Sequence, residues 1–150
     1  EYLTALAGQF DEDSCPFCRA IASEPELVVV RRDHAYVVLN KFPYNSGHLL
    51  ICTNRHVATY DLLSDAEAKD IQELTQQAMR TLTAVSGCSG FNIGMNQGRV
   101  AGAGVQDHFH QHVVPRWAND SNFMPIVAGT KVISELLEQT RELLLKNWQN

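Results

Sequence analysis

The sequence is poor in positive charge and in long apolar runs, and both shortages limit what the protein can do. Its 150 residues carry 12 lysines and arginines against 17 aspartates and glutamates, a formal net charge of −5. Proteins that coat nucleic acid or lie on a membrane surface need a basic face, so neither partner is expected. Apolar runs such as Val28–Val30 are far too short to span a bilayer. A small anionic ligand needs only a few local donors, and the candidates are Lys41, Arg55, Arg99 and Arg116.

Cysteines are also few, and the sequence as given opens without a charged-then-apolar leader. The four cysteines are therefore expected to be reduced thiols, and the cytoplasm is the expected location. Repeats and long linkers are absent, and a chain of 150 residues suits a single core. We expect one domain over residues 1–150, with residues 1–14 as a loosely ordered N-terminal segment.

The apolar pattern predicts five strands and two main helices. The expected strands are Leu27–Arg31, Ala35–Asn40, His48–Thr53, Phe91–Asn96 and Phe109–Arg116. A short helix is expected after Cys15, a long one from a capping box at Ser64–Glu67 to Gly87, and another over Ile133–Leu144. The strands follow one another through hairpin-like turns and long loops, without regular βαβ alternation. This order favours the α+β class, with an antiparallel sheet and helices packed on one side.

Three of the six histidines stand on alternate positions, in the run His108-Phe109-His110-Gln111-His112. In an extended strand the three imidazoles would share one face at a spacing of roughly 6.5–7 Å. Histidine changes its charge near neutral pH, so it suits nucleophilic, acid–base and metal-binding work. A single histidine on an apolar face is usually a core residue, but three in register indicate a functional site.

The segment before the histidines, residues 96–105, contains three glycines. Glycine lets backbone amides converge on a ligand, as in the concavities that bind phosphate. Placed next to the histidines, this loop suggests a phosphate held beside an imidazole. The central His110 is then the expected nucleophile, neutral and with one ring N–H held by a carbonyl. His112 would donate to a phosphate or leaving-group oxygen.

The run His108–Val114 resembles the signature of the histidine-triad (HIT) superfamily, His-x-His-x-His followed by two apolar residues. The likeness extends over nearly the whole chain, through Cys15–Cys18, Asn45–Leu49 and Asn54–Val57 to Trp117. Membership implies an α+β protomer with a five-stranded antiparallel sheet, paired into a homodimer. It also implies nucleotidyl transfer or hydrolysis through a covalent nucleotidyl-histidine.

The same resemblance implies roles for individual residues. His110 matches the covalent nucleophile, with His112 and His108 as the other members of the catalytic triad. Asn96 matches the polar residue that contacts the α-phosphate, and Asn40 matches the residue that binds the ribose hydroxyls.

Two apolar residues and the glycine-bearing loop complete the implied substrate site. Phe17 and Leu39 fall where apolar side chains enclose the base, although core packing is an equally good interpretation of both. The loop residues Gly102, Ala103 and Gly104 are expected to offer backbone amides to phosphate.

Within the superfamily the chain is most similar to the bacterial diadenosine tetraphosphate phosphorylase-like branch. The long loop Asn96–Gly102, the ending Val113–Trp117 and the continuation Asn119–Pro125 carry this likeness. The chain departs from the branch at Ala103-Gly104, where Gly-Ser is frequent, and so lacks a hydroxyl donor to phosphate. Both phosphate and water therefore stay open as the acceptor in the second step.

The expected function is cleavage of dinucleoside polyphosphates, by phosphorolysis or hydrolysis, and such a substrate could carry a bound divalent cation. The alternatives are a Hint-like purine nucleoside phosphoramidate hydrolase and a non-catalytic adenosine-nucleotide-binding protein. A further alternative from chemistry alone is a metal-dependent enzyme with His-x-His ligands. That site usually needs a nearby carboxylate, and the window Phe91–Trp117 offers only Asp107.

Cys15 and Cys18 have the spacing of half a zinc site, which two imidazoles would complete as a closed tetrahedral shell. His56 and His108 are the candidates, and a structural zinc in many bacterial HIT proteins resembles this set. A redox pair would need a thioredoxin-like βαβ setting, which the sequence does not show. Two unliganded thiols at a helix start are the remaining alternative.

The other cysteines and histidines are expected to have ordinary structural roles. Cys52 and Cys88 lack matching partners and should pack as small apolar groups. His34 is expected in a solvated turn. His48 is expected to form hydrogen bonds at a strand start, with a direct role in the site as the alternative.

Overall fold

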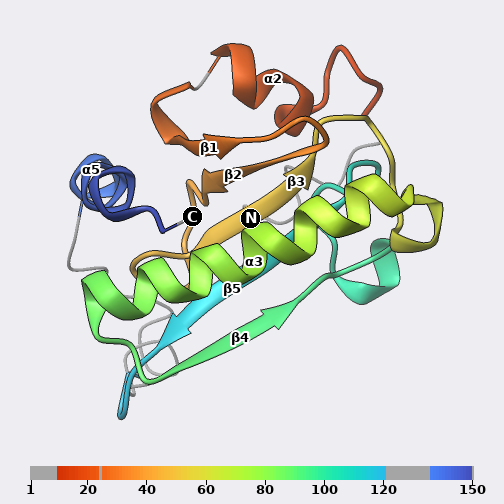
Figure 1. The fold of residues 1–150 in the computed structure, drawn as a ribbon. Coiled ribbons are helices and arrows are strands. Elements are labelled where there is room, and N and C mark those ends of the chain that lie inside the picture. The colour runs from red at the N-terminus through yellow and green to blue at the C-terminus, as the bar shows by residue number, and fades with distance from the viewer. Residues whose placement is uncertain (1–9, 24, 121–135, 150) are drawn as a thin grey trace.

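The computed structural model describes residues 10–23, 25–120 and 136–149, and within them one antiparallel sheet carries the fold. Its strands lie in the order β1-β2-β3-β5-β4, and every neighbouring pair is antiparallel (Figure 1). The strands are β1 (Val28–Arg31), β2 (Ala35–Leu39), β3 (Leu49–Thr53), β4 (Gly90–Gly94) and β5 (His110–Arg116). The α+β prediction with a five-stranded antiparallel sheet is thus confirmed.

The long helix α3 (Asp65–Ser86) begins and ends where the sequence predicts. Ser64 and Glu67 form a reciprocal capping box that satisfies exposed amides of the first turn. The helix ends at Gly87, whose φ of 61° is left-handed and costs glycine little. Buried apolar residues at helical spacing, among them Leu74 and Leu82, hold α3 against β2, β3 and β5.

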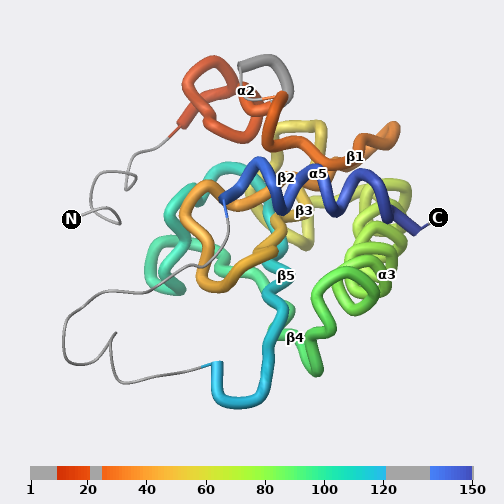
Figure 2. The backbone as a smooth tube through the Cα atoms, turned by 90° about the vertical axis from the view of Figure 1, so that its left-hand side faces the viewer, coloured from red at the N-terminus to blue at the C-terminus, as the bar shows by residue number. Residues whose placement is uncertain are grey.

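The other α-helices among the described residues are α2 (Pro16–Ser23) and α5 (Leu137–Asn147), and three short 3-10 helices lie at Pro25–Leu27, Tyr60–Leu62 and Arg99–Ala101. Helix α5 packs against α3 and β1, at one edge of the sheet (Figures 1 and 2). Residues 133–135 of the predicted last helix lie outside the described residues, as do positions 121–125 of the family-like continuation and residues 1–9 of the N-terminal segment. No helix among the described residues is long and apolar enough to cross a membrane.

The alternation along β5 separates a helix-covered face from a histidine face. The Gln111 side chain donates to Thr75 Oγ1 of α3 at 2.7 Å, and Val113 is fully buried. His110 and His112 point to the opposite face, beside Leu50 of β3. The predicted division is therefore correct within the strand, whereas His108 lies before it and outside the cavity. The strand itself begins one residue later than predicted, at His110, because the Phe109 amide donates to the Val57 carbonyl outside the sheet.

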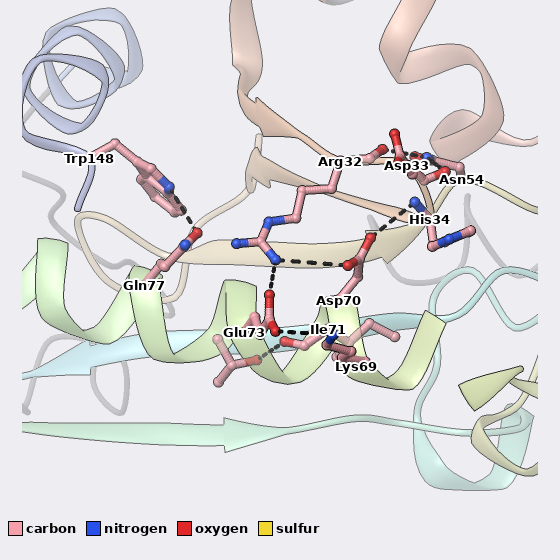
Figure 3. A network of polar contacts seen from close by, with 11 residues as sticks. Arg32, Asp33, His34, Asn54, Lys69, Asp70, Ile71, Glu73, Gln77 and Trp148 are labelled. Carbon is pink, nitrogen blue, oxygen red and sulfur yellow. Dashed lines mark hydrogen bonds and ion pairs between the residues drawn. The ribbon is translucent and has the colours of Figure 1, made fainter. Parts of the chain in front are cut away.

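A polar network fastens the turn between β1 and β2 to α3 (Figure 3). Arg32 pairs with Asp70 and Glu73, and the His34 amide donates to Asp70. The Asn54 side chain donates to the carbonyls of the same turn. This network lies on the helix side, so it supports the sheet without contributing to the histidine face.

Candidate active site and metal centre

A cavity of about 690 Å³ opens on the histidine face. This volume lies within the range of roughly 300–1,000 Å³ typical of small-molecule sites. Its lining includes most of the predicted site residues: Phe17, Leu39, Asn40, Asn96, Gly102, Gly104, His110 and His112. Ala103 lies between two lining glycines without lining the cavity itself. His108 is likewise outside the lining and is fully buried.

His110 lines the cavity with one ring nitrogen already engaged. Its Nδ1 lies 2.9 Å from the backbone oxygen of His108. A carbonyl can only accept, so the proton belongs on Nδ1 and the free lone pair on Nε2. Burial lowers the pKa of His110, which keeps the ring neutral near pH 7. The ring of Phe17 packs at 4.8 Å between centroids.

The hydrogen bonds of His48 give His112 the tautomer opposite to that of His110. The Tyr44 amide donates to His48 Nδ1 at 3.0 Å, which places the His48 proton on Nε2. His48 Nε2 lies 2.9 Å from His112 Nδ1 and therefore donates to it. The remaining proton of neutral His112 must then be on its own Nε2. Burial, and then the neighbouring His110, lowers the pKa of His112 to about 4, which favours this neutral form.

The two cavity histidines thus differ in what they offer a ligand. His110 offers a lone pair, whereas His112 offers an N–H. One is suited to attack an electrophilic phosphorus, and the other to donate to a phosphate or leaving-group oxygen. A backbone amide and a backbone carbonyl fix this difference, so it is built into the fold.

His108 belongs to a second cluster. Its Nδ1 lies 3.4 Å from Cys15 Sγ and 3.3 Å from Cys18 Sγ, and Cys18 Sγ lies 3.2 Å from His56 Nδ1. The four ligand atoms of this set all lie within 4.8 Å of one another. The sequence-predicted zinc ligands are therefore brought together from the N-terminal end of α2, the segment after β3 and the segment just before β5.

The dimensions and chemistry of this cluster fit a tetrahedral zinc ion. Zn–S and Zn–N bonds of about 2.3 and 2.0–2.1 Å imply sulfur–nitrogen separations of about 3.6 Å, close to those present. The Nε2 of His108 donates to the Thr53 carbonyl at 2.8 Å, so its Nδ1 lone pair faces the thiols. Burial, together with Cys15, raises the pKa of Cys18 to about 12, so the thiolate needs a nearby cation.

Two of the candidate anion donors have protein partners. Arg55 makes a bidentate ion pair with the buried Glu67, and Arg116 does so with Asp120. Both therefore support the fold rather than a ligand. Lys41 lines the cavity, as does Arg19, which the sequence had not indicated.

The sequence interpretation gave too little weight to His48 and missed Tyr44. His48 is completely buried and connects the Tyr44 amide to His112, so it is part of the site as well as of the strand start. The available signal was Gly47-His48, a histidine at the predicted start of a strand, and it did not indicate His112 as the partner. The predictions for Cys52, Cys88 and His34 agree with the structure, because the two cysteines are buried and His34 is exposed.

The chain belongs to the HIT domain family, whose family model matches residues 22–119. A relative from Mycobacterium tuberculosis, "AP-4-A phosphorylase", is 44% identical over 128 residues. That alignment covers 85% of this chain and 66% of the relative, so the chain spans slightly less than two thirds of the relative's length.

Solved structures share the fold. A zinc-bound histidine triad family protein from Mycobacterium smegmatis superposes with a TM-score of 0.74 and 21% identity, covering 92% of this chain and 95% of that one. Plasmodium falciparum diadenosine triphosphate hydrolase superposes with a TM-score of 0.64 and 26% identity, covering 80% and 73%.

Proposed function

We propose that this protein cleaves dinucleoside polyphosphates of the diadenosine tetraphosphate type through a nucleotidyl group carried on His110. The observation that carries the proposal is the hydrogen bond from His110 Nδ1–H to the His108 carbonyl. It leaves Nε2 as the nucleophilic nitrogen of a ring that lines the cavity.

In the first step His110 Nε2 attacks the α-phosphorus, and the bond from that phosphorus to the bridging oxygen breaks. The leaving polyphosphate departs with the electron pair, and the His112 Nε2–H donates a hydrogen bond to the oxygen that gains charge. In the second step an oxygen of inorganic phosphate or water attacks the same phosphorus and releases His110. Phosphate gives a nucleoside diphosphate, and water gives a monophosphate and the loss of a proton.

The cavity offers matching places for the reacting nucleotide. Phe17 and Leu39 would enclose the base, Asn40 would bind the ribose, and Asn96 with the loop amides would hold the α-phosphate. The cavity lining formed by the described residues includes the cations Arg19 and Lys41 and no carboxylate. Cations at the cavity of a protein whose net charge is −5 support an anionic ligand.

The names of the similar proteins support the reaction class without fixing the acceptor. The M. tuberculosis relative is named for phosphorolysis of diadenosine tetraphosphate, and the P. falciparum structure for hydrolysis of diadenosine triphosphate. The two names give different acceptors, phosphate and water, for the cleavage of a diadenosine polyphosphate.

We further propose that Cys15, Cys18, His56 and His108 hold a structural zinc ion. The zinc would supply a closed, non-catalytic crosslink between α2 and the sheet. The fit of the four ligand atoms supports this assignment, as does the zinc in the M. smegmatis structure.

We also propose a homodimer. Strand β4 lies at the edge of the sheet and its residues Asn92, Ile93 and Gly94 are exposed. An open edge strand of this kind is a natural surface for pairing with a second chain.

The deciding experiment is incubation with diadenosine tetraphosphate, with and without inorganic phosphate. Phosphorolysis yields ATP and ADP, whereas hydrolysis yields ATP and AMP. Release of AMP and no ADP at every phosphate concentration would exclude phosphorolysis and leave hydrolysis as the reaction. Failure to cleave either this substrate or diadenosine triphosphate, with turnover of an adenosine phosphoramidate instead, would overturn the proposed substrate class.

A further inference from the structure

Two half-exposed aromatic rings stand at the cavity beside His112. Phe42 and Tyr44 retain 47% and 51% of their accessible surface, and both line the cavity. The proposed enclosure for the reacting base is formed by other residues, Phe17 and Leu39. Phe42 and Tyr44 therefore have no assigned role in binding that nucleotide.

The aromatic and imidazole rings form a row across the site. Phe17 lies 4.8 Å from His110, His110 lies 5.3 Å from His112, and His112 lies 5.7 Å from Tyr44, all between ring centroids. The Tyr44 ring is stacked on His112 with an interplanar angle of 15°. The row thus begins at the proposed base pocket and ends, beyond the proposed leaving-group donor, at an open aromatic ring.

The backbone under these rings is fixed. The Phe42 amide donates to Asn40 Oδ1 at 3.0 Å, and the Tyr44 amide donates to His48. Asn45 then joins the loop to the Pro115 carbonyl and to Asp120. A preorganised aromatic surface loses little entropy when a flat ring stacks on it.

We propose that Phe42 and Tyr44 form a stacking subsite for the second nucleobase of a dinucleoside polyphosphate, on the leaving-group side of the reaction. This inference rests on the proposed function and deepens it, because it assigns a binding place to the second nucleoside of that substrate. Lys41, next to Phe42, would meet the phosphates that connect them. Stacking reads the face of a base rather than its edge, so the second base can be adenine or guanine.

Binding to a non-cleaving protein tests the subsite. In the His110→Ala background, calorimetry would compare diadenosine tetraphosphate with adenosine 5′-tetraphosphate, which lacks the second nucleoside. We expect the dinucleotide to bind about tenfold more tightly, the order of magnitude that loss of one stacked base produces. Adding Phe42→Ala or Tyr44→Ala should remove most of this advantage, and Tyr44→Phe should preserve it.

Tyr60→Ala is the matched control, because Tyr60 is also 51% exposed and does not line the cavity. If the His110→Ala protein fails to fold, the ratio of kcat/KM for the two substrates in the wild-type background replaces the binding ratio. Equal affinity for the two ligands, or an advantage that survives both alanine variants, would overturn the subsite. Lack of cleavage of any nucleoside polyphosphate by the wild type would instead overturn the proposed function.

Discussion

The two ends of the histidine run differ sharply in their surroundings, although both carry the same residue type. His108 lies among two thiols and a third imidazole, fully buried and outside the cavity. His110 and His112 line the cavity instead. The difference lies in the partner of each ring: a carbonyl of β3 for His108, the carbonyl of His108 for His110, and the His48 ring for His112.

Each partner determines which nitrogen remains available and in which protonation state. His108 turns a lone pair towards the thiols, His110 turns one towards the cavity, and His112 turns an N–H towards it. The proposed roles of metal ligand, nucleophile and leaving-group donor can therefore fall to one residue type, because neighbouring groups set the tautomer of each ring separately. Separate loss of these functions is the test of this view.

The largest difference in turnover, metal content and stability is expected between the His110→Ala and His108→Ala variants. Loss of the nucleophile should lower kcat by about 10³-fold or more, as for other covalent catalysts, with metal content and thermal stability little changed. His108→Ala should instead release the metal and destabilise the fold. Turnover, zinc content and melting temperature would be measured on the same preparations, and near-normal turnover of His110→Ala would rule out the covalent mechanism.

Cys18→Ser tests the proposed zinc site formed by Cys15, Cys18, His56 and His108. A structural zinc site contributes folding free energy directly, so we expect a loss of about 3 kcal/mol or more from the free energy of unfolding. Cys88→Ser is the control, because Cys88 is a buried thiol outside the cluster. Metal analysis and denaturant unfolding would check this, and a protein without zinc whose stability is unaffected by Cys18→Ser would contradict the assignment.

His48 variants test the relay of hydrogen bonds that runs from the Tyr44 amide through His48 and sets the tautomer of His112. His48→Leu removes the N–H that His112 Nδ1 accepts and should lower kcat by about 30-fold, the order expected from losing one well-placed donor. His48→Gln can accept from the Tyr44 amide and donate to His112, so it should restore much of the rate. Nitrogen NMR of His112 would report its tautomer, and equal rates for the two variants would contradict the relay.

Gly104→Ser tests the acceptor. A β-carbon at Gly104 would meet no atom within 4 Å, so the serine fits sterically. A hydroxyl donor to phosphate should strengthen phosphate binding about tenfold and shift the products towards ADP. Gly104→Ala adds the bulk without the hydroxyl and should leave the product ratio as it is. The ratio of ADP to AMP measured against phosphate concentration would decide, and identical ratios for the two variants would count against this prediction.

The smallest expected effect concerns the Glu67 carboxylate, which belongs neither to the Cys/His cluster nor to the cavity lining. Hydrogen bonds from Arg55 lower the pKa of Glu67 to about 2, from an ordinary 4.5. The pKa is lower in the folded state, so this stabilisation is present above pH 4.5 and is lost as the pH falls towards 2. Because Arg55 is half exposed, we expect about 1–2 kcal/mol. Glu67→Gln should remove this acid dependence in pH-dependent unfolding, without changing zinc content at neutral pH.

Much of this protein follows from its sequence alone, because local patterns encode it. The period of two places His110 and His112 opposite Gln111, and the Ser64–Glu67 box begins α3 where it does. The spacing of Cys15 and Cys18 is that of half a zinc site, and it left two unliganded thiols as the alternative. These signals are local, since strand alternation, helix capping and a two-residue gap between ligands all act over a few residues.

Only the tertiary structure decided the partners across the sheet. His48 and His112 are 64 positions apart in sequence, and their hydrogen bond exists because β3 pairs with β5 in one particular register. His108, just before β5, contacts Cys15 and Cys18, which lie 93 and 90 positions earlier in the sequence. Tautomers and burial depend on these long-range neighbours, and a single sequence contains no local signal for them.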